Sequence, residues 1–193
     1  MQNEIEKDFE LYIQEQHKLL ACLSIEEIDT FIQSIQDLRD SGHTLWILGN
    51  GGSAATASHL VTDFSKGASE NGMKPLRALA PSEFVSLQTA IANDIDYAQV
   101  YSKTLELLAE AGDAVLIISV SGRSPNLVHA AEFARQAQIN VLSIVGERGT
   151  KLQNLSHSCI MVPSNDYQIV ENIQLTLGHW IMKQLKINSN CGG

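Results

Sequence analysis

The sequence predicts an α/β fold built on a parallel β-sheet. Short β-type runs alternate with longer amphipathic segments, and two of these runs lead directly into Ser/Gly-rich loops that are followed by helical patterns. Because parallel strands are joined by crossovers, usually helices, this alternation places helices on both faces of one sheet. A length of 193 residues suits one domain with a sizeable core. No linker or shift in composition interrupts the chain, so we expect a single domain over residues 1–193.

The N-terminal segment predicts two helices. From Ile5 to about Asp40 the apolar residues recur at steps of three and four, as on an amphipathic helix. Ser24 followed by Glu27 forms a capping box that starts the second helix, and Gly42 ends it. These helices, at about residues 1–41, belong to no strand–helix repeat. We expect a helical hairpin used in oligomerisation, and the alternative is a helix pair that covers its own sheet.

The rest of the chain predicts five strands and the helices between them. Strands are expected at 43–48, 76–79, 114–120, 140–145 and 158–162, and helices at 82–93, at 100–109, after the loop that begins near 121, and at 168–185. In sheets of this kind, ligands bind where loops leave the carboxyl ends of the strands. Both Ser/Gly-rich loops are expected there.

The first loop, Gly49-Asn50-Gly51-Gly52-Ser53, follows the first strand. Its glycines allow the backbone to approach a ligand closely, and the amides that open the next helix point toward any bound anion. A tight turn without a ligand explains one such loop equally well. The sequence here contains neither a dinucleotide fingerprint nor the Lys of a P-loop, so we expect no nucleotide cofactor.

The second loop favours a ligand-binding role over a tight turn without a ligand. Ser119, Ser121 and Ser124 surround Gly122, and Pro125 lies near the first helical turn, so this loop also ends at a helix N-terminus. Two such loops in one sheet favour the binding of a phosphate group.

Composition excludes several classes of protein. The formal net charge of -9 argues against a nucleic-acid surface, which depends on clustered Lys and Arg. No apolar stretch approaches the ~20 residues of a membrane helix, and the N-terminus is acidic, so we expect no membrane association and a cytoplasmic location. Cys22, Cys159 and Cys191 are scattered, which makes a disulfide framework or a zinc ribbon improbable.

Three segments carry a family resemblance. GNGGSAATASH after a strand, AIAND, and ISVSGRSPN after another strand resemble the sugar isomerase (SIS) domain, specifically its phosphoheptose isomerase branch, and the likeness runs over nearly the whole chain. The resemblance implies a flavodoxin-like three-layer sandwich with a five-stranded parallel sheet, and a homotetramer with active sites at subunit interfaces. It also implies the isomerisation of D-sedoheptulose 7-phosphate, a seven-carbon ketose, to D-glycero-D-manno-heptose 7-phosphate.

The resemblance also implies roles for individual residues. It assigns phosphate and sugar contacts to Asn50, Gly51, Gly52, Ser53, Asp94, Ser119, Val120, Ser121, Ser124 and Glu171. It assigns metal binding to His59, Asp63, Glu171 and His179, and catalysis to Asp63, Glu171 and His179. The spacing is compatible with this, because His59 and Asp63 are four positions apart on one helix face. Two imidazoles and two carboxylates suit zinc. His17, His43, His129 and His157 have no comparable setting and are read as surface or packing residues.

The chain departs from the family pattern at four places. Asp63 stands where the pattern has Glu, Glu171 where it has Gln, Gly67 where it has an Arg, with Lys66 beside it, and Gln168 where it has Asp. The shorter Asp63 carboxylate lies about one methylene further from a substrate proton, and proton transfer requires heavy atoms within about 3 Å.

Three hypotheses about function follow. The first is an aldose–ketose isomerase in which Asp63 or Glu171 removes a carbon-bound proton and His179 moves the hydroxyl proton. The second is a non-catalytic SIS module that binds phosphosugars and acts as a regulatory or protein-binding tetramer. The third is an isomerase of another phosphosugar. The presence of both His59 and His179 favours an enzyme.

Overall fold

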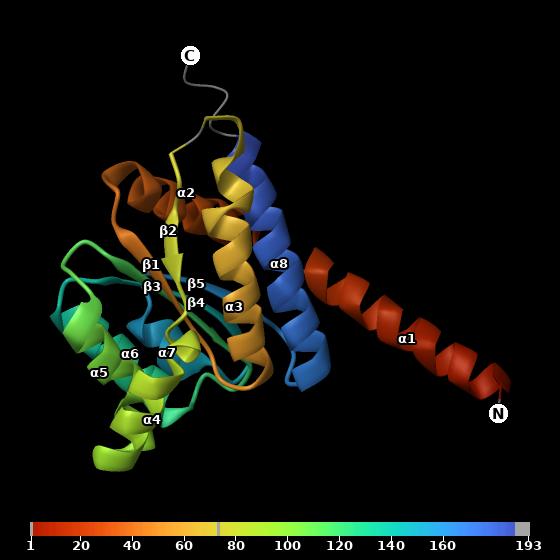
Figure 1. Ribbon diagram of the computed structural model, residues 1–193. Coiled ribbons are helices and arrows are strands. Elements are labelled where there is room, and N and C mark those ends of the chain that lie inside the picture. Colours follow the sequence, from red (N-terminus) through yellow and green to blue (C-terminus); the bar gives the residue numbers. More distant parts are fainter. Residues whose placement is uncertain (1, 73, 188–193) are drawn as a thin grey trace.

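The computed structural model describes residues 2–72 and 74–187. Five strands form one sheet: β1 (Thr44–Leu48), β2 (Arg77–Leu79), β3 (Ala114–Ser119), β4 (Asn140–Gly146) and β5 (Ser158–Val162). Their order is β2-β1-β3-β4-β5, and every neighbouring pair is parallel (Figure 1). The predicted parallel five-stranded α/β architecture is confirmed, and each strand lies within a residue or two of its expected position.

The described ranges contain eight α-helices: α1 (Gln2–Ala21), α2 (Ile25–Ser41), α3 (Gly52–Ser65), α4 (Val85–Asp94), α5 (Val100–Leu108), α6 (Pro125–Gln136), α7 (Thr150–Leu155) and α8 (Tyr167–Ile187). The sequence analysis missed α7 and the 3-10 helices Gly67–Gly72, Pro81–Glu83 and Tyr97–Gln99. Each is too short to show a helical period. None of the helices in the described parts of the chain is long and apolar enough to span a bilayer.

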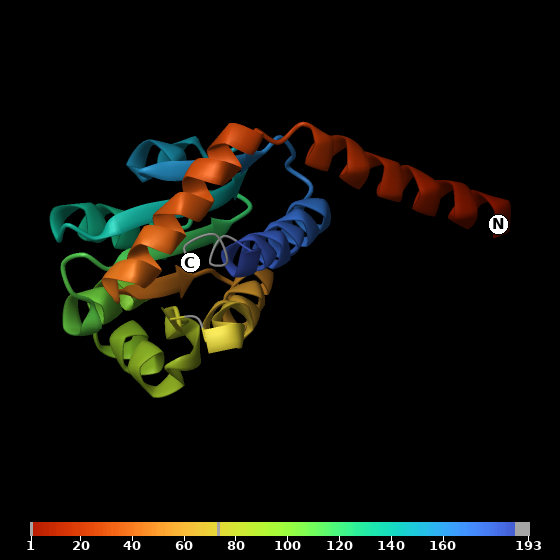
Figure 2. The ribbon, with the colours of Figure 1, turned by 90° about the horizontal axis from the view of Figure 1, so that it is seen from above.

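The sheet is covered on both faces. Leu45 and Ile47 of β1 face the core shared with α2, α3 and α8, whereas Trp46 and Leu48 face the core shared with α5 and α6. Successive side chains of a strand point to opposite faces, so a strand buried on both sides is apolar throughout. Figures 1 and 2 show the resulting three layers, with α3 and α8 lying side by side along one face.

The two N-terminal helices behave differently from one another. Ser24 accepts a hydrogen bond from Glu27 N (3.2 Å), and Gly42 ends α2 in the left-handed conformation, as predicted. Helix α2 buries Phe31 and Ile35 against its own sheet. The expected hairpin is open, because α1 runs away from the body of the protein (Figures 1 and 2).

Asp113 ties β3 to β1 at the amino ends of the strands. Its carboxylate is 4% exposed and accepts hydrogen bonds from Thr44 N (2.8 Å), Trp46 Nε1 (2.8 Å) and Glu110 N (3.1 Å). His43 Nδ1 lies 3.6 Å from the same carboxylate. A buried charge is tolerated when its hydrogen bonds are satisfied in this way.

We expect Asp113→Ala to lower the free energy of unfolding by about 3–5 kcal/mol, because three donors lose a charged acceptor in a buried site. Denaturant unfolding measures this change. The matched control is Asp29→Ala on the exposed face of α2, which should change stability by no more than about 0.5 kcal/mol. Equal effects of the two substitutions would contradict the assignment of Asp113 as a structural anchor.

Candidate functional site

The two Ser/Gly-rich loops leave neighbouring strands. β1 and β3 pair in parallel, with Leu48 opposite Ile117, so the loops that follow them emerge side by side at the carboxyl edge of the sheet. β2 lies on one side of β1, and β3 to β5 lie on the other. The order of the strands therefore reverses between β1 and β3, and ligands of doubly wound sheets bind at this topological switch point.

A cavity of about 100 Å³ opens between the two loops. It is lined by Asn50, Ser53, Ile118, Ser119, Val120, Ser121, Ser124, Leu127, Tyr167 and Glu171. Pockets that enclose whole small molecules are usually about 300–1,000 Å³, so this cavity has room for a phosphate-sized group and leaves the rest of a sugar phosphate outside. Seven of the ten residues that were expected to contact the substrate line it.

The serine side chains make the cavity rich in hydrogen-bond donors. Ser119 Oγ accepts from Gly122 N (3.0 Å) and Ser121 Oγ accepts from Arg123 N (3.3 Å). Because these bonds use oxygen lone pairs, both hydroxyl hydrogens remain available to a ligand. The hydroxyl of Ser124 does not cap α6. The N-termini of α3 and α6 add their partial positive charge, and the whole arrangement suits an anion.

Glycines hold the loops in this shape. Gly122 has φ 59°, and a Cβ placed on it would lie 2.3 Å from the Cα of Gly149. Gly51 also has positive φ, at 56°, but a Cβ there would meet no atom within 4 Å. A Cβ on Gly52 would lie 2.5 Å from Glu171 Oε2, so the carboxylate of Glu171 rests directly on the first turn of α3.

Three polar residues that the sequence analysis missed support the first loop. The side-chain amides of Asn50 and Asn126 exchange two hydrogen bonds of 2.9 Å, and Tyr97 donates to Asn50 Oδ1 (3.2 Å). The hydroxyl of Tyr101 donates to the carbonyl of Gly49. Burial, and secondarily the neighbouring Tyr97, raises the pKa of Tyr101 to about 12, which keeps this donor protonated at neutral pH. No local pattern marks these tyrosines, whereas Asn126 directly follows Ser124-Pro125 in the second loop.

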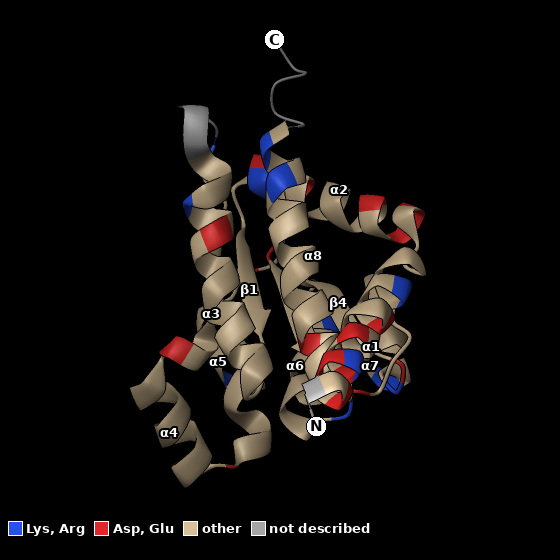
Figure 3. Cartoon of the chain, turned by 90° about the vertical axis from the view of Figure 1, so that its right-hand side faces the viewer, with Lys and Arg blue, Asp and Glu red and all other residues tan. Residues whose placement is uncertain are grey.

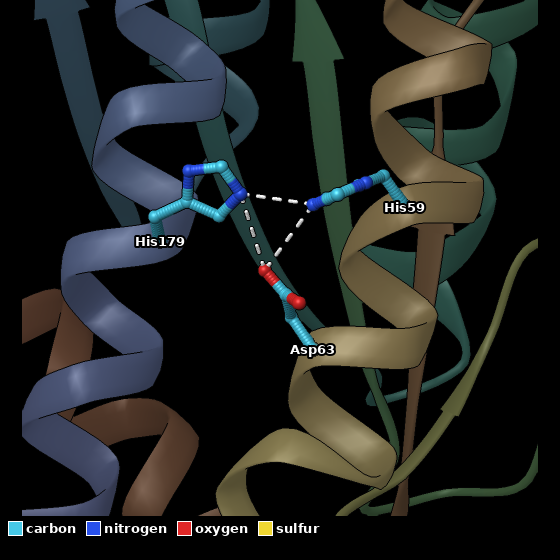
Figure 4. Close-up of side chains that lie close together, drawn as sticks. All are labelled: His59, Asp63 and His179. Atoms are coloured by element: carbon cyan, nitrogen blue, oxygen red, sulfur yellow. Dashed lines mark hydrogen bonds and ion pairs between the residues drawn. The ribbon is translucent and has the colours of Figure 1, made fainter.

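A second group of polar side chains lies further along α3 and α8. His59 Nε2 is 2.9 Å from His179 Nε2, and Asp63 Oδ2 is 3.5 Å from each of these nitrogens. The three side chains point toward one another from the two helices (Figure 4). Both histidines are exposed, whereas the Asp63 side chain is 18% exposed.

A close approach of the helices brings this group together. His59 and Asp63 share one face of α3, since four positions make about one turn. On α8, a Cβ on Gly178 would lie 2.3 Å from Leu60 Cδ2, so any larger residue would force the buried Leu60 side chain or the helices to shift. His179, the next residue, is thereby brought against His59.

The group has the composition of a metal site. Asp63 Oδ2 is buried and has no hydrogen-bond partner in the described part of the chain, which is costly for a carboxylate oxygen unless something binds it. Tetrahedral Zn²⁺ with bonds of about 2.0–2.1 Å has ligand-to-ligand distances of about 3.4 Å. The observed triangle of 2.9, 3.5 and 3.5 Å is close to one face of such a tetrahedron. Two imidazoles and a carboxylate, with a fourth position open, resemble catalytic zinc sites.

Glu171 is not part of this group. It is eight positions before His179 on α8, a distance of about 12 Å at 1.5 Å per residue. Gly52 is seven positions before His59 on α3, which corresponds to about 10 Å. The cavity and the His–His–Asp group therefore lie at different positions along the same pair of helices. Glu171 lies at the cavity. A role for Glu171 in metal binding stays a prediction.

Other predicted site residues, and other positions that depart from the family pattern, lie outside both the cavity and the His–His–Asp group. Asp94 is exposed at the end of α4 and does not line the cavity, so its contact with a sugar stays a prediction. Gly67 packs against the side chain of Met182, and Gln168 is exposed. Cys22 and Cys159 are free thiols, while Cys191 lies outside the described residues.

A larger cavity, of about 420 Å³, lies at the opposite edge of the sheet. Its lining includes His43, Trp46 and Asp113. The carboxylate of Asp113 is saturated by its structural hydrogen bonds, and neither of the two Ser/Gly-rich loops lines this cavity. The serine hydroxyls and helix N-termini that suit an anion therefore lie at the carboxyl edge of the sheet.

Comparison with known proteins agrees with this geometry. Residues 11–146 match the SIS domain family. A probable phosphoheptose isomerase of Thermoplasma acidophilum is 34% identical over 174 residues, covering 90% of this chain and 95% of that protein. The phosphoheptose isomerase of Helicobacter hepaticus is 34% identical over 194 residues, covering 100% of this chain and 95% of that protein. The structure of a phosphoheptose isomerase from Neisseria gonorrhoeae shares the fold, with a TM-score of 0.85 at 24% identity over 95% of this chain and 97% of that chain.

Gly122→Ala should destabilise the protein more than Gly51→Ala. Both substitutions impose positive φ on a residue with a Cβ, at a cost of about 1–3 kcal/mol. Only Gly122→Ala also forces a Cβ against backbone atoms of Gly149, which adds about 1–3 kcal/mol of overpacking. Thermal and denaturant unfolding of the two variants measure the difference. If Gly51→Ala proved equally damaging, the close contact of the second loop with Gly149 would be wrong.

Proposed function

The chain belongs to the SIS domain family, in its phosphoheptose isomerase branch, and from this we propose that it interconverts D-sedoheptulose 7-phosphate and D-glycero-D-manno-heptose 7-phosphate. The reaction moves a carbonyl group between C2 and C1 of a phosphorylated seven-carbon sugar. The relatives that are named phosphoheptose isomerases match most of this chain and most of their own length. A non-catalytic regulatory module, the second hypothesis above, receives no comparable support.

The main support for this proposal is the distance, along α3 and α8, between the cavity and the His–His–Asp group. The cavity suits the phosphate, and the His–His–Asp group lies about 10–12 Å further along both helices. An extended seven-carbon chain spans roughly 7.5 Å from C1 to C7, and its phosphate ester adds about 2.5 Å, given C–C bonds of about 1.5 Å. With the phosphate in the cavity, C1 and C2 of this sugar reach His59, Asp63 and His179.

The same spacing favours a seven-carbon substrate over a shorter phosphosugar. A five-carbon chain is roughly 2.5 Å shorter, so when C1 of a seven-carbon sugar lies within the about 3 Å that proton transfer requires, C1 of the five-carbon sugar lies about 2.5 Å beyond that limit. This distinguishes the proposal from the third hypothesis, an isomerase of another phosphosugar.

Asp63 is the proposed base. Its carboxylate removes a proton from C1 of the open-chain ketose, the C1–H electron pair forms the C1=C2 bond, and the C2 carbonyl oxygen takes up a proton to give an enediol. Loss of the O1 proton then forms the C1 carbonyl, and return of a proton to C2 completes the aldose. Glu171, which lines the phosphate cavity, is placed to accept hydrogen bonds from sugar hydroxyls nearer the phosphate end.

His179 is proposed to exchange the hydroxyl protons, because the ring nitrogens of an imidazole can both donate and accept protons. Zinc held by His59, Asp63 and His179 would supply a Lewis acid that polarises the sugar oxygens. Both roles of His179 use its Nε2 atom, which faces His59 and Asp63. Nε2 cannot bind zinc and exchange a proton at the same time. A measurement of whether turnover requires zinc therefore decides between these two roles.

We also propose that the protein is a homotetramer, as the family resemblance implies. α1 projects from the body with Ile5 and Phe9 70% and 63% exposed, and burial of such side chains against another copy would be favourable. The adjacent surface of α3 and α8 carries few charged residues along its middle (Figure 3). Light scattering should give four times the chain mass of 21.1 kDa, and a stable monomer would contradict the proposal.

A cytoplasmic location stays a prediction from composition.

The decisive experiment for the activity is incubation with D-sedoheptulose 7-phosphate, with and without added zinc, followed by analysis of the products. Formation of a heptose 7-phosphate supports the proposal. If only five- or six-carbon ketose phosphates are converted, the substrate assignment is wrong. If no phosphorylated ketose is converted, the enzymatic proposal fails.

Removal of either serine hydroxyl should weaken phosphate binding. Ser53→Ala and Ser121→Ala should each raise the dissociation constant of sugar phosphate by the equivalent of about 1–3 kcal/mol, the usual loss for a hydrogen bond to a charged group. Calorimetric titration measures this. Ser156→Ala is a suitable control, because Ser156 bonds to Leu152 O and Ser143 away from the cavity. Unchanged affinity in both cavity variants would count against the phosphate site.

His179→Ala should abolish turnover and leave the fold and phosphate affinity largely intact. The phosphate contacts come from the serine loops, about 10 Å away along the helices, whereas the variant removes one of the three clustered side chains. It should also lose bound zinc, measured by metal analysis after dialysis. His157→Ala, at a histidine that accepts from Val141 N outside the cluster, is the control. Near-normal turnover in His179→Ala would overturn the mechanism.

A further inference from the structure

A pair of hydrogen-bonded amides joins the two loops that frame the cavity. Asn50 Nδ2 donates to Asn126 Oδ1, and Asn126 Nδ2 donates to Asn50 Oδ1, each over 2.9 Å. Asn50 lines the cavity, whereas Asn126 is 1% exposed and does not. Asn126 therefore has no access to a ligand in the cavity, and any influence it has on that ligand passes through Asn50.

The backbone fixes which way the Asn126 amide faces. Asn126 Oδ1 also accepts from Leu127 N at 3.0 Å, an N–H that is shared with the carbonyl of Ser124. If the amide turned over, its NH₂ group would face this N–H, and two donors would oppose each other in a buried site. Such an arrangement is unfavourable, so the oxygen of Asn126 must face Leu127.

The fixed orientation of the Asn126 amide also fixes the orientation of the Asn50 amide. Since Asn126 presents its oxygen to Asn50 Nδ2 and its nitrogen to Asn50 Oδ1, the Asn50 amide has one allowed orientation. Tyr97 donates to the same Asn50 Oδ1 at 3.2 Å, so both lone pairs of this oxygen are used. One N–H of Asn50 Nδ2 has no partner among the described residues, and it belongs to a side chain that lines the cavity.

We propose that Asn126 is a positioning residue that fixes Asn50 as a hydrogen-bond donor to a phosphate oxygen of the substrate. This inference rests on the proposed binding of a phosphosugar. A phosphate dianion offers only acceptors, so a side chain that is fixed as a donor on this side of the cavity favours it over groups that must donate. The amide pair adds a directed donor to the serine hydroxyls from a loop that contains no Lys or Arg.

The test is a double-mutant cycle with inorganic phosphate and D-sedoheptulose 7-phosphate as probes. Asn50→Ala should weaken binding of both probes roughly tenfold or more, as expected for the loss of a hydrogen bond to a charged group. Asn126→Ala should weaken binding roughly threefold to tenfold, because Asn50 then loses its fixed orientation. The double variant should bind no more weakly than Asn50→Ala alone, since Asn126 acts only through Asn50. Asn154→Ala, exposed on α7, should bind like the unmodified protein.

Further measurements separate positioning from a loss of structure. Asn126→Ala should raise KM for the heptulose phosphate and leave kcat nearly unchanged, because the amide pair lies at the phosphate end of the site. If Asn126→Ala does not fold, Asn126→Asp serves instead. Its carboxylate still accepts from Leu127 N but cannot donate to Asn50 Oδ1, and it should weaken binding of both probes at least as much.

The outcomes are distinct from those for the activity. Coupling measured with inorganic phosphate supports the inference even if the unmodified protein converts no heptulose phosphate, a result that would contradict only the proposed function. Additive effects of Asn50→Ala and Asn126→Ala, or unchanged binding in Asn126→Ala and Asn126→Asp, overturn the inference. Failure of both probes to bind the unmodified protein overturns the inference and the phosphate site together.

Discussion

The parallel pairing of β1 with β3 is the constraint on which the site depends. It places the ends of two strands from separate repeats next to each other, so two loops that are about 70 residues apart in the chain share one small cavity. Because the strands also order the helices that follow them, the N-termini of α3 and α6 converge on the same point. The Asn50–Asn126 amide pair then joins the two loops directly.

Close packing of α3 against α8 has an equally specific consequence. Gly178 allows the approach, and the same approach brings His179 to His59 and leaves one buried oxygen of Asp63 without a hydrogen-bond partner among the described residues. A helix is a rigid rod with a fixed rise, so the distance from this group to the cavity is set by residue count alone. The two helices therefore act together as a spacer between the cavity, the proposed phosphate site, and the His–His–Asp group, which is proposed to exchange protons.

Two of the four departures from the family pattern, Asp63 and Glu171, fall at different places along this spacer. Asp63 lies in the His–His–Asp group, where its carboxylate is 3.5 Å from a histidine nitrogen on each helix. Glu171 lies at the cavity, where its carboxylate rests on the first turn of α3. A negative charge at a helix N-terminus is favourable, but it shares the cavity with the proposed phosphate. Glu171 thus adds a negative charge at this end of the site, where the family pattern has the neutral Gln.

The sequence by itself determined the parallel α/β fold, the positions of all five strands, the two Ser/Gly-rich loops, and most of the residues that line the cavity. These features depend on local periodicity, glycine and serine content, and helix capping, which are written in neighbouring residues. The resemblance added the pairing of His59 and Asp63 with His179. Only the tertiary structure decided that Glu171 belongs to the cavity rather than to the His–His–Asp group, that Asn126 orients Asn50, and that α1 leaves the body of the protein. Each of these depends on contacts between segments far apart in the chain, and such contacts leave no periodic trace in the sequence.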